Sequence, residues 1–472
     1  MKKNSLSLFS LLKCKKYTYI RLLFLSVLPA LLLLLTQSKI PDAGSPQTDE
    51  PEFHKWAPVP PMGWNSWDCF GPTVVEQEVK ANADYMAKYL RKAGWQYIVV
   101  DIRWYVENDK AGGYNQNDPR YVMDEYGRLI PALNRFPSAA DGKGFKPLAD
   151  YVHSKGLKFG IHIMRGIPVI AVQKNSPILG SNARAQDIYT TERQCRWLRD
   201  MYTIVSDREG AQEYYNSIFQ LYASWGVDFV KVDDLSGRLD EIALVRKAID
   251  NCGRPIVLSL SPSGNRTENA EFLKNNANMW RTTGDFWDRW VDLKNEFEVC
   301  NRWTAFRGKG YYPDADMLPL GKIGIRAERG EPRMTLFTPD EQYTLMTLFA
   351  IFRSPLMFGG NLPDNDQFTL SLITNKEVLK VNQQSSNNRQ VTRENDLIVW
   401  TADDPKTGDK YVALFNASDT PDAEVSVKFD QIGLSGSHNV KDLWTGKKIG
   451  KFTGSFSQKI RMHGAGLYKI SN

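Results

Sequence analysis

Cysteine is scarce in this chain, and its few occurrences exclude a metal site built on it. The 472 residues include five cysteines, and no two of them form a Cys-x-x-Cys pair. The ligand spacing of cysteine-rich metal sites is therefore absent. Four of the five are widely spaced: Cys69, Cys195, Cys252 and Cys300. For these four, disulfides and buried free thiols both remain open.

A surplus of one charge is also missing once the N-terminus is set aside. Residues 1–38 carry six basic residues and no acidic one, which accounts for the whole net charge of +6. Without those six, 54 basic residues face 54 acidic ones. Such a balance gives no electrostatic footprint for nucleic acid, so we do not expect nucleic acid as a partner.

Long apolar runs are rare, and the clearest one lies near the N-terminus. Residues 22–35 are apolar except for one serine and Pro29, and basic residues precede them. The run is shorter than the roughly 20 residues of a spanning helix and fits a secretory signal. We expect 1–38 to be a signal peptide of an exported protein, periplasmic or extracellular. An uncleaved membrane anchor is the alternative. Residues 39–56, rich in Pro, Asp, Gly and Ser, are predicted to be a linker.

Apolar runs alternate with helical patterns over some 300 residues. The runs predict strands at 97–101, 158–164, 227–234, 255–260 and 278–282. The helical patterns between them lie at 79–93, 145–155, 210–225 and 240–251. Such alternation is typical of parallel strands with right-handed crossovers. No Gly-x-Gly-x-x-Gly follows a strand, which counts against a dinucleotide fold. We therefore predict a (β/α)₈ TIM barrel over residues 57–384.

Near residue 385 the pattern changes to short strands separated by turn residues. These strands are predicted at 397–400, 411–415, 423–429, 440–444 and 466–470. No helical pattern occurs among them. The composition indicates an all-β antiparallel sandwich over residues 385–472.

Carboxylates follow two of the barrel strands. Asp233 lies near the end of the run 227–234, and Asp285 follows the strand at 278–282. The carboxyl ends of parallel strands form the active-site face of a barrel. Two carboxylates at one face are the minimal equipment for cleaving a glycosidic bond. We expect a carbohydrate substrate and no metal or organic cofactor, because acid, nucleophile and water complete that chemistry.

Several short motifs carry a resemblance to a known family. They read Pro-Met-Gly-Trp-Asn-Ser-Trp at 61–67, Val-Asp at 100–101, Gly-Ile-His at 160–162, Lys-Val-Asp at 231–233, Trp-Arg at 280–281, Asp-Ala-Asp-Met-Leu at 314–318 and Ser-Pro-Leu-Met-Phe-Gly-Gly-Asn-Leu at 354–362. In this order they resemble glycoside hydrolase family 27, the α-galactosidase and α-N-acetylgalactosaminidase family. The resemblance covers nearly all of residues 58–472.

The resemblance implies a retaining mechanism with Asp233 as nucleophile and Asp285 as acid/base. Lys231, two residues before Asp233 on the same strand face, would lower the pKa of the nucleophile. Burial and the Asp233 anion would hold Asp285 protonated. A structural salt bridge between Lys231 and Asp233 is the alternative. Asp234 and Asp288 are interpreted as hydrogen-bonding or solvated neighbours.

The resemblance also implies a set of sugar-binding residues. Trp64 resembles an aromatic floor under the sugar, with a core tryptophan as the alternative. Asp101 resembles a carboxylate that holds hydroxyls, and Arg281 a fork that orients a carboxylate or the 2-hydroxyl. Asp316 is interpreted as lying near the sugar or as a structural cap. His162 stands where the family often has tyrosine and is either a substrate donor or a barrel histidine.

Two departures from the family pattern concern the sugar. Galactosidases of the family commonly carry adjacent aspartates after the second strand, whereas this chain has Asp101 followed by Ile102. Ile102 cannot bond to a hydroxyl, so recognition is weakened or rebuilt through Arg103 or Arg165. After the fifth strand, Ser261 begins a run of small residues that resembles the N-acetylgalactosaminidase branch.

The sequence thus predicts an exported retaining exo-glycosidase, with an α-galactosidase as the leading hypothesis. An α-N-acetylgalactosaminidase or a β-L-arabinopyranosidase with the same two aspartates is the alternative within this chemistry. A non-catalytic carbohydrate-binding protein is the alternative of another class, and it is disfavoured because both Asp233 and Asp285 are present.

Overall fold

The structure is a computed structural model, and it describes residues 50–262 and 264–472. The predicted signal peptide lies outside the described residues, as do residues 39–49 of the predicted linker. Among the helices that are described, none combines the length and the apolarity needed to cross a bilayer.

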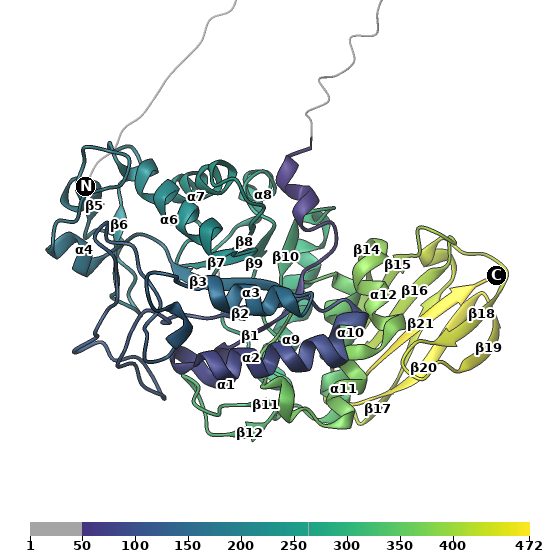
Figure 1. Ribbon diagram of the computed structural model, residues 1–472. Helices are drawn as coiled ribbons and strands as arrows, with labels where there is room; N and C mark the ends of the chain where they lie inside the picture. The colour runs from purple at the N-terminus through teal and green to yellow at the C-terminus, as the bar shows by residue number, and fades with distance from the viewer. Residues whose placement is uncertain (1–49, 263) are drawn as a thin grey trace, which may run out of the picture. The chain divides into compact units, whose positions relative to one another are not determined.

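Eight parallel strands form the barrel sheet (Figure 1). In chain order they are β1 (Met62–Asn65), β2 (Tyr97–Val100), β3 (Lys158–Met164), β7 (Phe229–Asp233), β8 (Val257–Leu260), β9 (Met279–Arg281), β10 (Tyr312–Asp314) and β13 (Leu356–Phe358). From β1 to β10, each strand pairs with the next one in this series, and β13 pairs with β1. Between β10 and β13, the N–H of Leu318 donates to the Met357 carbonyl at 2.8 Å, which closes the ring.

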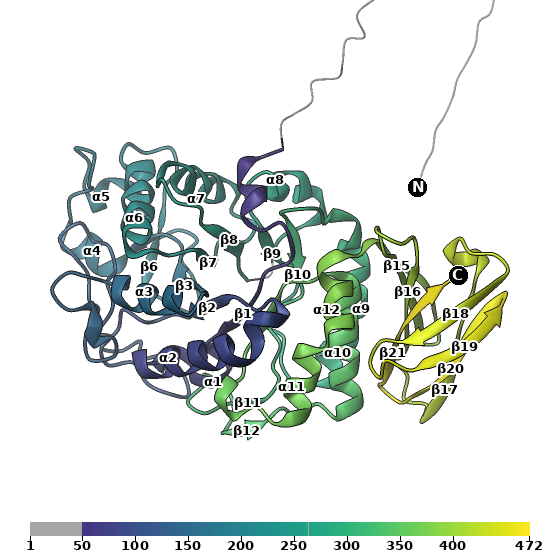
Figure 2. The ribbon, with the colours of Figure 1, turned by 45° about the vertical axis from the view of Figure 1, so that its right-hand side comes forward.

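Helices follow the strands and cover the outside of the sheet (Figure 2). The longer ones are α2 (Glu76–Tyr85), α3 (Lys146–Ser154), α6 (Ala211–Trp225), α7 (Leu239–Asn251), α9 (Trp290–Trp303), α10 (Pro339–Phe352), α11 (Gln367–Thr374) and α12 (Lys376–Gln384). The shorter ones are α1 (Trp67–Phe70), α4 (Val169–Gln173), α5 (Ala185–Ile188) and α8 (Ala270–Lys274). The predicted (β/α)₈ barrel is confirmed.

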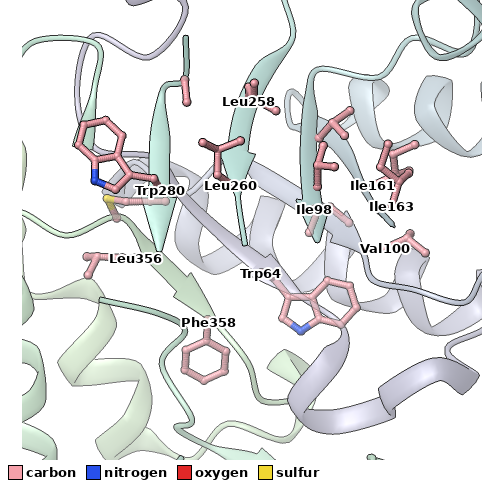
Figure 3. Packing of buried hydrophobic residues seen from close by; sticks show 14 of the residues in the cluster. Trp64, Ile98, Val100, Ile161, Ile163, Leu258, Leu260, Trp280, Leu356 and Phe358 are labelled. Carbon is pink, nitrogen blue, oxygen red and sulfur yellow. The ribbon is translucent and has the colours of Figure 1, made fainter. Parts of the chain in front are cut away.

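Alternation along the strands divides the core into two layers. On β2, Ile98 and Val100 face the helices, together with Trp64 of β1 (Figure 3). Tyr97 and Val99 belong to a second cluster with residues of the other barrel strands. Successive side chains of a strand point to opposite faces, so this parity decides which residues face the barrel interior.

Two insertions build the rim of the barrel. The first follows β3 and contains a three-stranded sheet of β4 (Ile167–Pro168), β6 (Met201–Ile204) and β5 (Tyr189–Thr190). The second follows β10 and contains the pair β11 (Lys322–Ile323) and β12 (Arg333–Met334). Neither insertion was predicted, because these strands are too short to show a periodic pattern.

The C-terminal domain is antiparallel and all-β, as predicted. Its strands are β14 (Ser386–Glu394), β15 (Leu397–Asp403), β16 (Lys410–Asn416), β17 (Asp422–Lys428), β18 (Ser437–Asp442), β19 (Lys448–Thr453), β20 (Ser455–Arg461) and β21 (Ala465–Ser471). They form a six-stranded sheet, β14-β15-β16-β21-β18-β19, and the pair β17-β20. The sequence missed β14, β19 and β20, because they are largely polar and partly exposed.

The predicted linker ends earlier than residue 56. Glu52–Trp56 form a 3₁₀ turn in which Phe53 and His54 are buried. Nε2 of His54 lies 2.8 Å from the carbonyl oxygen of Lys274 on the barrel. Within the described part of the chain, the cysteines form no disulfide: Cys69, Cys195, Cys252 and Cys300 are free thiols.

Candidate active site

A cavity of about 300 Å³ opens at the carboxyl ends of the barrel strands. Of the residues singled out from the sequence, those that line it are Asp101, His162, Lys231, Asp233, Ser261, Arg281, Asp285 and Asp316. They come from β2, β3, β7, β8, β9 and the segment after β10, which span more than 200 residues of sequence. Strand parity brings them together, since Asp101, His162, Lys231 and Asp233 all fall on the inward face.

Asp233 is buried at the end of β7 and is held as a carboxylate. Its Oδ1 accepts a hydrogen bond from the Asp234 N–H at 2.8 Å, and its Oδ2 lies 3.0 Å from Nε2 of His162. Burial alone would raise the pKa of Asp233, but the contact and charge of His162, with Lys231, outweigh it and lower the pKa to about 2. An ionised carboxylate is the form that a nucleophile requires.

His162 links Asp233 to a second carboxylate. Its Nδ1 lies 2.6 Å from Oδ1 of Asp101. The two ring nitrogens approach these oxygens closely without aligned hydrogen-bond geometry, so the attraction is chiefly that of ion pairs. Burial lowers the pKa of His162, yet the Asp101 charge outweighs burial and raises it. The two flanking carboxylates therefore favour the imidazolium form of His162.

Asp101 is fixed by neighbours on three strands. Asn65 of β1 donates to its Oδ2 at 2.8 Å, and Lys231 Nζ of β7 lies 3.7 Å from the same oxygen. Burial opposes its ionisation, but His162 and Lys231 lower the pKa of Asp101. The carboxylate is rigidly placed at the edge of the cavity.

Asp285 differs from the prediction. Its side chain is 60% exposed at the rim of the cavity, and Nη2 of Arg281 lies 3.4 Å from its Oδ1. The expectation that this carboxyl is buried is wrong, because it lies in a loop after β9 that leaves it in solvent. The cavity nevertheless contains both Asp233 and Asp285.

Arg281 and Asp316 form a buried pair that also lines the cavity. Nη1 of Arg281 lies 2.8 Å from Oδ1 of Asp316, whose Oδ2 accepts the Phe286 N–H at 2.8 Å. Asp316 has a φ of 80°, which is uncommon for a residue other than glycine. The pair fixes the loop that carries Asp285.

Trp64 does not line the cavity. It is fully buried in the layer between strands and helices (Figure 3), and its Nε1–H donates to the Gly360 carbonyl at 2.8 Å. Trp67, on the first turn after β1, lines the cavity instead. Its ring stacks on that of Tyr114, with the ring centroids 5.9 Å apart. The ring centroids of Tyr114 and Trp197 are also 5.9 Å apart. Trp64 is therefore a core tryptophan, which was the alternative interpretation, and does not form a floor under the sugar.

The arginines considered as replacement donors are engaged elsewhere. Arg103 is buried, with Nε 2.8 Å from Oδ2 of Asp200 and Nη1 3.0 Å from Oδ2 of Asp109. Arg165 pairs with Asp234 at 2.8 Å and with a buried glutamate on α7. Neither lines the cavity. Recognition rebuilt through Arg103 or Arg165 is therefore wrong, whereas Ile102 itself lines the cavity with an apolar side chain.

Several lining residues were not found from the sequence. They are Trp67, Asp68, Tyr114, Trp197, Pro262, Phe286, Trp287, Met317, Glu328 and Arg329. Most come from the rim insertions and the loops after the strands, where no periodic pattern assigns a direction to a side chain. Within the described residues, no three His, Cys, Asp or Glu side chains are grouped so that they could hold a metal ion.

Comparison with known proteins agrees with this geometry. The family model described as "Alpha galactosidase A" matches residues 59–176 and 199–384, and that of the "Alpha galactosidase C-terminal beta sandwich domain" matches 394–470. A curated relative, an α-galactosidase of Oryza sativa subsp. japonica, is 28% identical over 422 residues, covering 88% of this chain and 85% of the relative.

Two solved structures are more similar. A GH27 β-L-arabinopyranosidase from Geobacillus stearothermophilus is 54% identical, with a TM-score of 0.87, and the match covers 89% of this chain and 98% of that one. A protein from Bacillus halodurans C-125, provisionally assigned as an α-N-acetylgalactosaminidase, is 48% identical, with a TM-score of 0.79, over 87% and 97% of the two chains. The barrel, its sandwich and these matches together place the chain in glycoside hydrolase family 27, as a glycosidase of the α-galactosidase family.

Proposed function

We propose that this glycosidase removes terminal β-L-arabinopyranosyl residues from carbohydrates by a retaining double displacement. In the first step, a carboxylate oxygen of Asp233 attacks the anomeric carbon while the glycosidic C–O bond breaks, and Asp285 gives its proton to the departing oxygen. In the second step, the Asp285 carboxylate takes a proton from water, whose oxygen displaces Asp233 from the anomeric carbon. The low pKa of Asp233 supports its assignment as the nucleophile.

Ile102 is the observation that carries the sugar assignment. Its apolar side chain lines the cavity directly after Asp101, where the resemblance implies a second carboxylate. β-L-Arabinopyranose has the ring configuration of α-D-galactopyranose but lacks the hydroxymethyl group on C5. A hydroxyl left without a partner in a closed site costs about 1–3 kcal/mol, and Ile102 provides no partner. The pocket therefore favours the sugar without the hydroxymethyl group over α-galactose.

The α-N-acetylgalactosaminidase hypothesis rests on a different observation. Ser261 and Pro262 follow β8 and line the cavity with small side chains, which leaves room for a 2-acetamido group. The B. halodurans protein at 48% identity is the corresponding relative. We rank the α-N-acetylgalactosaminidase hypothesis second, because N-acetylgalactosamine also carries a hydroxymethyl group on C5 and Ile102 would still face it.

The test is a comparison of kcat/KM on three 4-nitrophenyl glycosides under identical conditions. We expect the β-L-arabinopyranoside to exceed the α-D-galactoside by more than tenfold, about 1.4 kcal/mol of transition-state preference. Ile102→Asp should reduce or reverse that ratio, and Ile102→Val is the matched control that should keep it. A wild-type preference for the α-D-galactoside, or for the α-N-acetylgalactosaminide, would replace the sugar assignment while leaving the two-aspartate chemistry intact.

We also propose that residues 1–38 direct export. The support is the sequence pattern alone: a basic segment followed by the apolar run 22–35. The full chain, expressed in a bacterial host, should yield a shortened mature protein outside the cytoplasm, as read by N-terminal sequencing of the exported fraction. An unshortened chain in the membrane fraction would favour the anchor, and an unshortened chain in the cytosol would refute export.

A further inference from the structure

The proposed reaction gives no role to the buried carboxyl of Asp68, which lines the cavity. Asp68 lies on α1 and is only 3% exposed, yet it lines the cavity that contains Asp233. Over the residues that the structure describes, no donor forms a hydrogen bond to its carboxyl, and Oδ2 is sealed from solvent without a partner. A buried polar atom without a partner destabilises a fold. Oδ2 itself is out of reach of a ligand, so Oδ1 is the atom of this cavity-lining carboxyl that is left to bind a partner supplied by a ligand.

The backbone is shaped to seat this carboxyl. Asp68 follows Trp67 on the first turn after β1, and Gly359 follows β13, the neighbouring strand. A Cβ atom at Gly359 would lie 1.9 Å from Oδ2 of Asp68. Any other residue at position 359 would therefore displace the carboxyl. The lack of a side chain at Gly359 therefore leaves the space that the Asp68 carboxyl occupies.

The charges around Asp68 favour its neutral form. Burial is the largest influence and raises the pKa of Asp68 well above its ordinary value. Asp316 after β10, Asp101 after β2 and Asp288 after β9 add to it by repulsion, whereas Lys231 of β7 acts in the opposite direction. A protonated carboxyl carries an O–H and can donate a hydrogen bond. A neutral Asp68 would therefore add a hydrogen-bond donor to the cavity wall.

We propose that Asp68 is a specificity-determining residue that donates a hydrogen bond to a hydroxyl of the sugar ring held in the cavity. The identity of that sugar rests on the proposed function, but the contact itself applies to any ring that fills the site. Trp67 presents an aromatic face one residue earlier, so the first turn after β1 would provide both an apolar and a polar contact to one ring. Ile102, which follows the adjacent strand β2, provides no polar contact.

The test compares Asp68→Ala with Asp68→Asn in the full chain. Loss of the donor in the alanine variant should lower kcat/KM on 4-nitrophenyl β-L-arabinopyranoside about 10–100-fold, chiefly through KM. The asparagine variant keeps a donor of similar size and should stay within about fivefold of wild type. Competitive inhibition by free L-arabinose should weaken in parallel with KM. KM of the wild type should rise at alkaline pH as Asp68 ionises, and that rise should be absent in Asp68→Asn.

Thermal unfolding separates this role from a structural one. Because the carboxyl is buried without a partner, Asp68→Ala should leave the midpoint temperature of unfolding unchanged or raise it by about 1–3 °C. Asp150→Ala on the exposed face of α3 is the control and should change neither kinetics nor midpoint. Kinetics within twofold of wild type for Asp68→Ala would overturn the proposal. Equal losses in both variants with a lowered midpoint would also overturn it. The ratio of variant to wild-type kcat/KM is also measured on the α-D-galactoside. This second substrate separates an error in the sugar assignment from an error in the Asp68 contact.

Discussion

Asp101, His162 and Asp233 form a line of alternating charge across three neighbouring strands. The imidazolium lies 2.6 Å from one carboxylate and 3.0 Å from the other. Each carboxylate stabilises the cation, and the cation keeps both acids ionised inside a buried wall. The positive charge of His162, rather than exposure to water, therefore keeps the Asp233 carboxylate ionised.

Substitution of the two aspartates should separate their roles. Asp233→Ala should lower kcat at least about 10⁴-fold, and azide should restore turnover with inverted product configuration because it replaces the nucleophile. Asp285→Ala should impair substrates with poor leaving groups far more than aryl glycosides, since only the former need protonation. Product anomers followed by NMR and a series of leaving groups provide the measurement. Identical leaving-group dependence in the two variants would contradict the assignment.

The pH profile should report the pairing of His162 with Asp233. With a pKa of about 2, Asp233 stays ionised as pH falls, so it does not set the acid limb of kcat/KM in the wild type. In His162→Gln the cation is lost and the carboxylate is disfavoured, so the pKa of Asp233 should rise and Asp233 should begin to set an acid limb at higher pH. His153→Gln is the matched control, because His153 pairs with Asp228, which does not line the cavity. An acid limb that stays in place in His162→Gln would refute the coupling.

At the scale of elements, α10 is the helix that both domains share. Nearly all of its side chains are buried, because it packs on α12 and on β21 of the sandwich. Thr344 Oγ1 donates to the His463 carbonyl at 2.6 Å, which ties the helix to the sandwich. A helix that is buried on nearly all sides has no polar stripe to define where it begins and ends. Its capping residues are therefore expected to matter more.

The N-cap of α10 should therefore contribute measurably to stability. Thr338 Oγ1 accepts the Glu341 N–H at 3.3 Å, and the Glu341 carboxylate accepts the Thr338 N–H at 2.8 Å. Thr338→Ala should lower the free energy of unfolding by about 1 kcal/mol in urea denaturation. Thr338→Ser retains the acceptor and should lose less than half of that amount. Equal losses in both variants would show that packing of the methyl group, and not the cap, is responsible.

At the scale of the molecule, barrel and sandwich share one hydrophobic cluster. Phe297 of α9 packs edge-on against Phe415 of β16, with ring centroids 5.0 Å apart. Trp290 stacks on His463 at 3.7 Å, and Nε1–H of Trp444 donates to Thr347 at 3.0 Å. Separation of the domains would expose these apolar faces to water, at about 25 cal/mol per Å².

The barrel should not be stable without its sandwich. A chain ending at residue 384 would leave the outer faces of α9 and α10 uncovered, and an exposed apolar patch of that kind promotes association. We expect aggregation in size-exclusion chromatography and loss of activity, whereas a chain beginning at Glu50 should remain monodisperse and active. A monodisperse and active product from the first truncation would show that the shared cluster is dispensable.

Two kinds of information in the sequence were sufficient for most of the fold. Apolar runs followed by polar or charged residues predicted β2, β3, β7, β8 and β9, because a strand buried on both faces must be largely apolar. Period-two alternation also placed Lys231 and Asp233 on one inward face. The same rule excludes Trp64 from the cavity, since its neighbours Gly63 and Asn65 face inward.

The tertiary structure decided the features that no local pattern encodes. Trp67, Asp68 and Trp197 lie after strands or in insertions, where the direction of a side chain depends on loops brought together from distant parts of the chain. The exposure of Asp285 and the pairing of Arg103 with Asp200 likewise depend on contacts between separate segments. Sequence alone therefore determined the barrel, the sandwich and the inward-facing strand residues. Only tertiary packing decided which side chains surround the sugar, because strand periodicity ends where the loops begin.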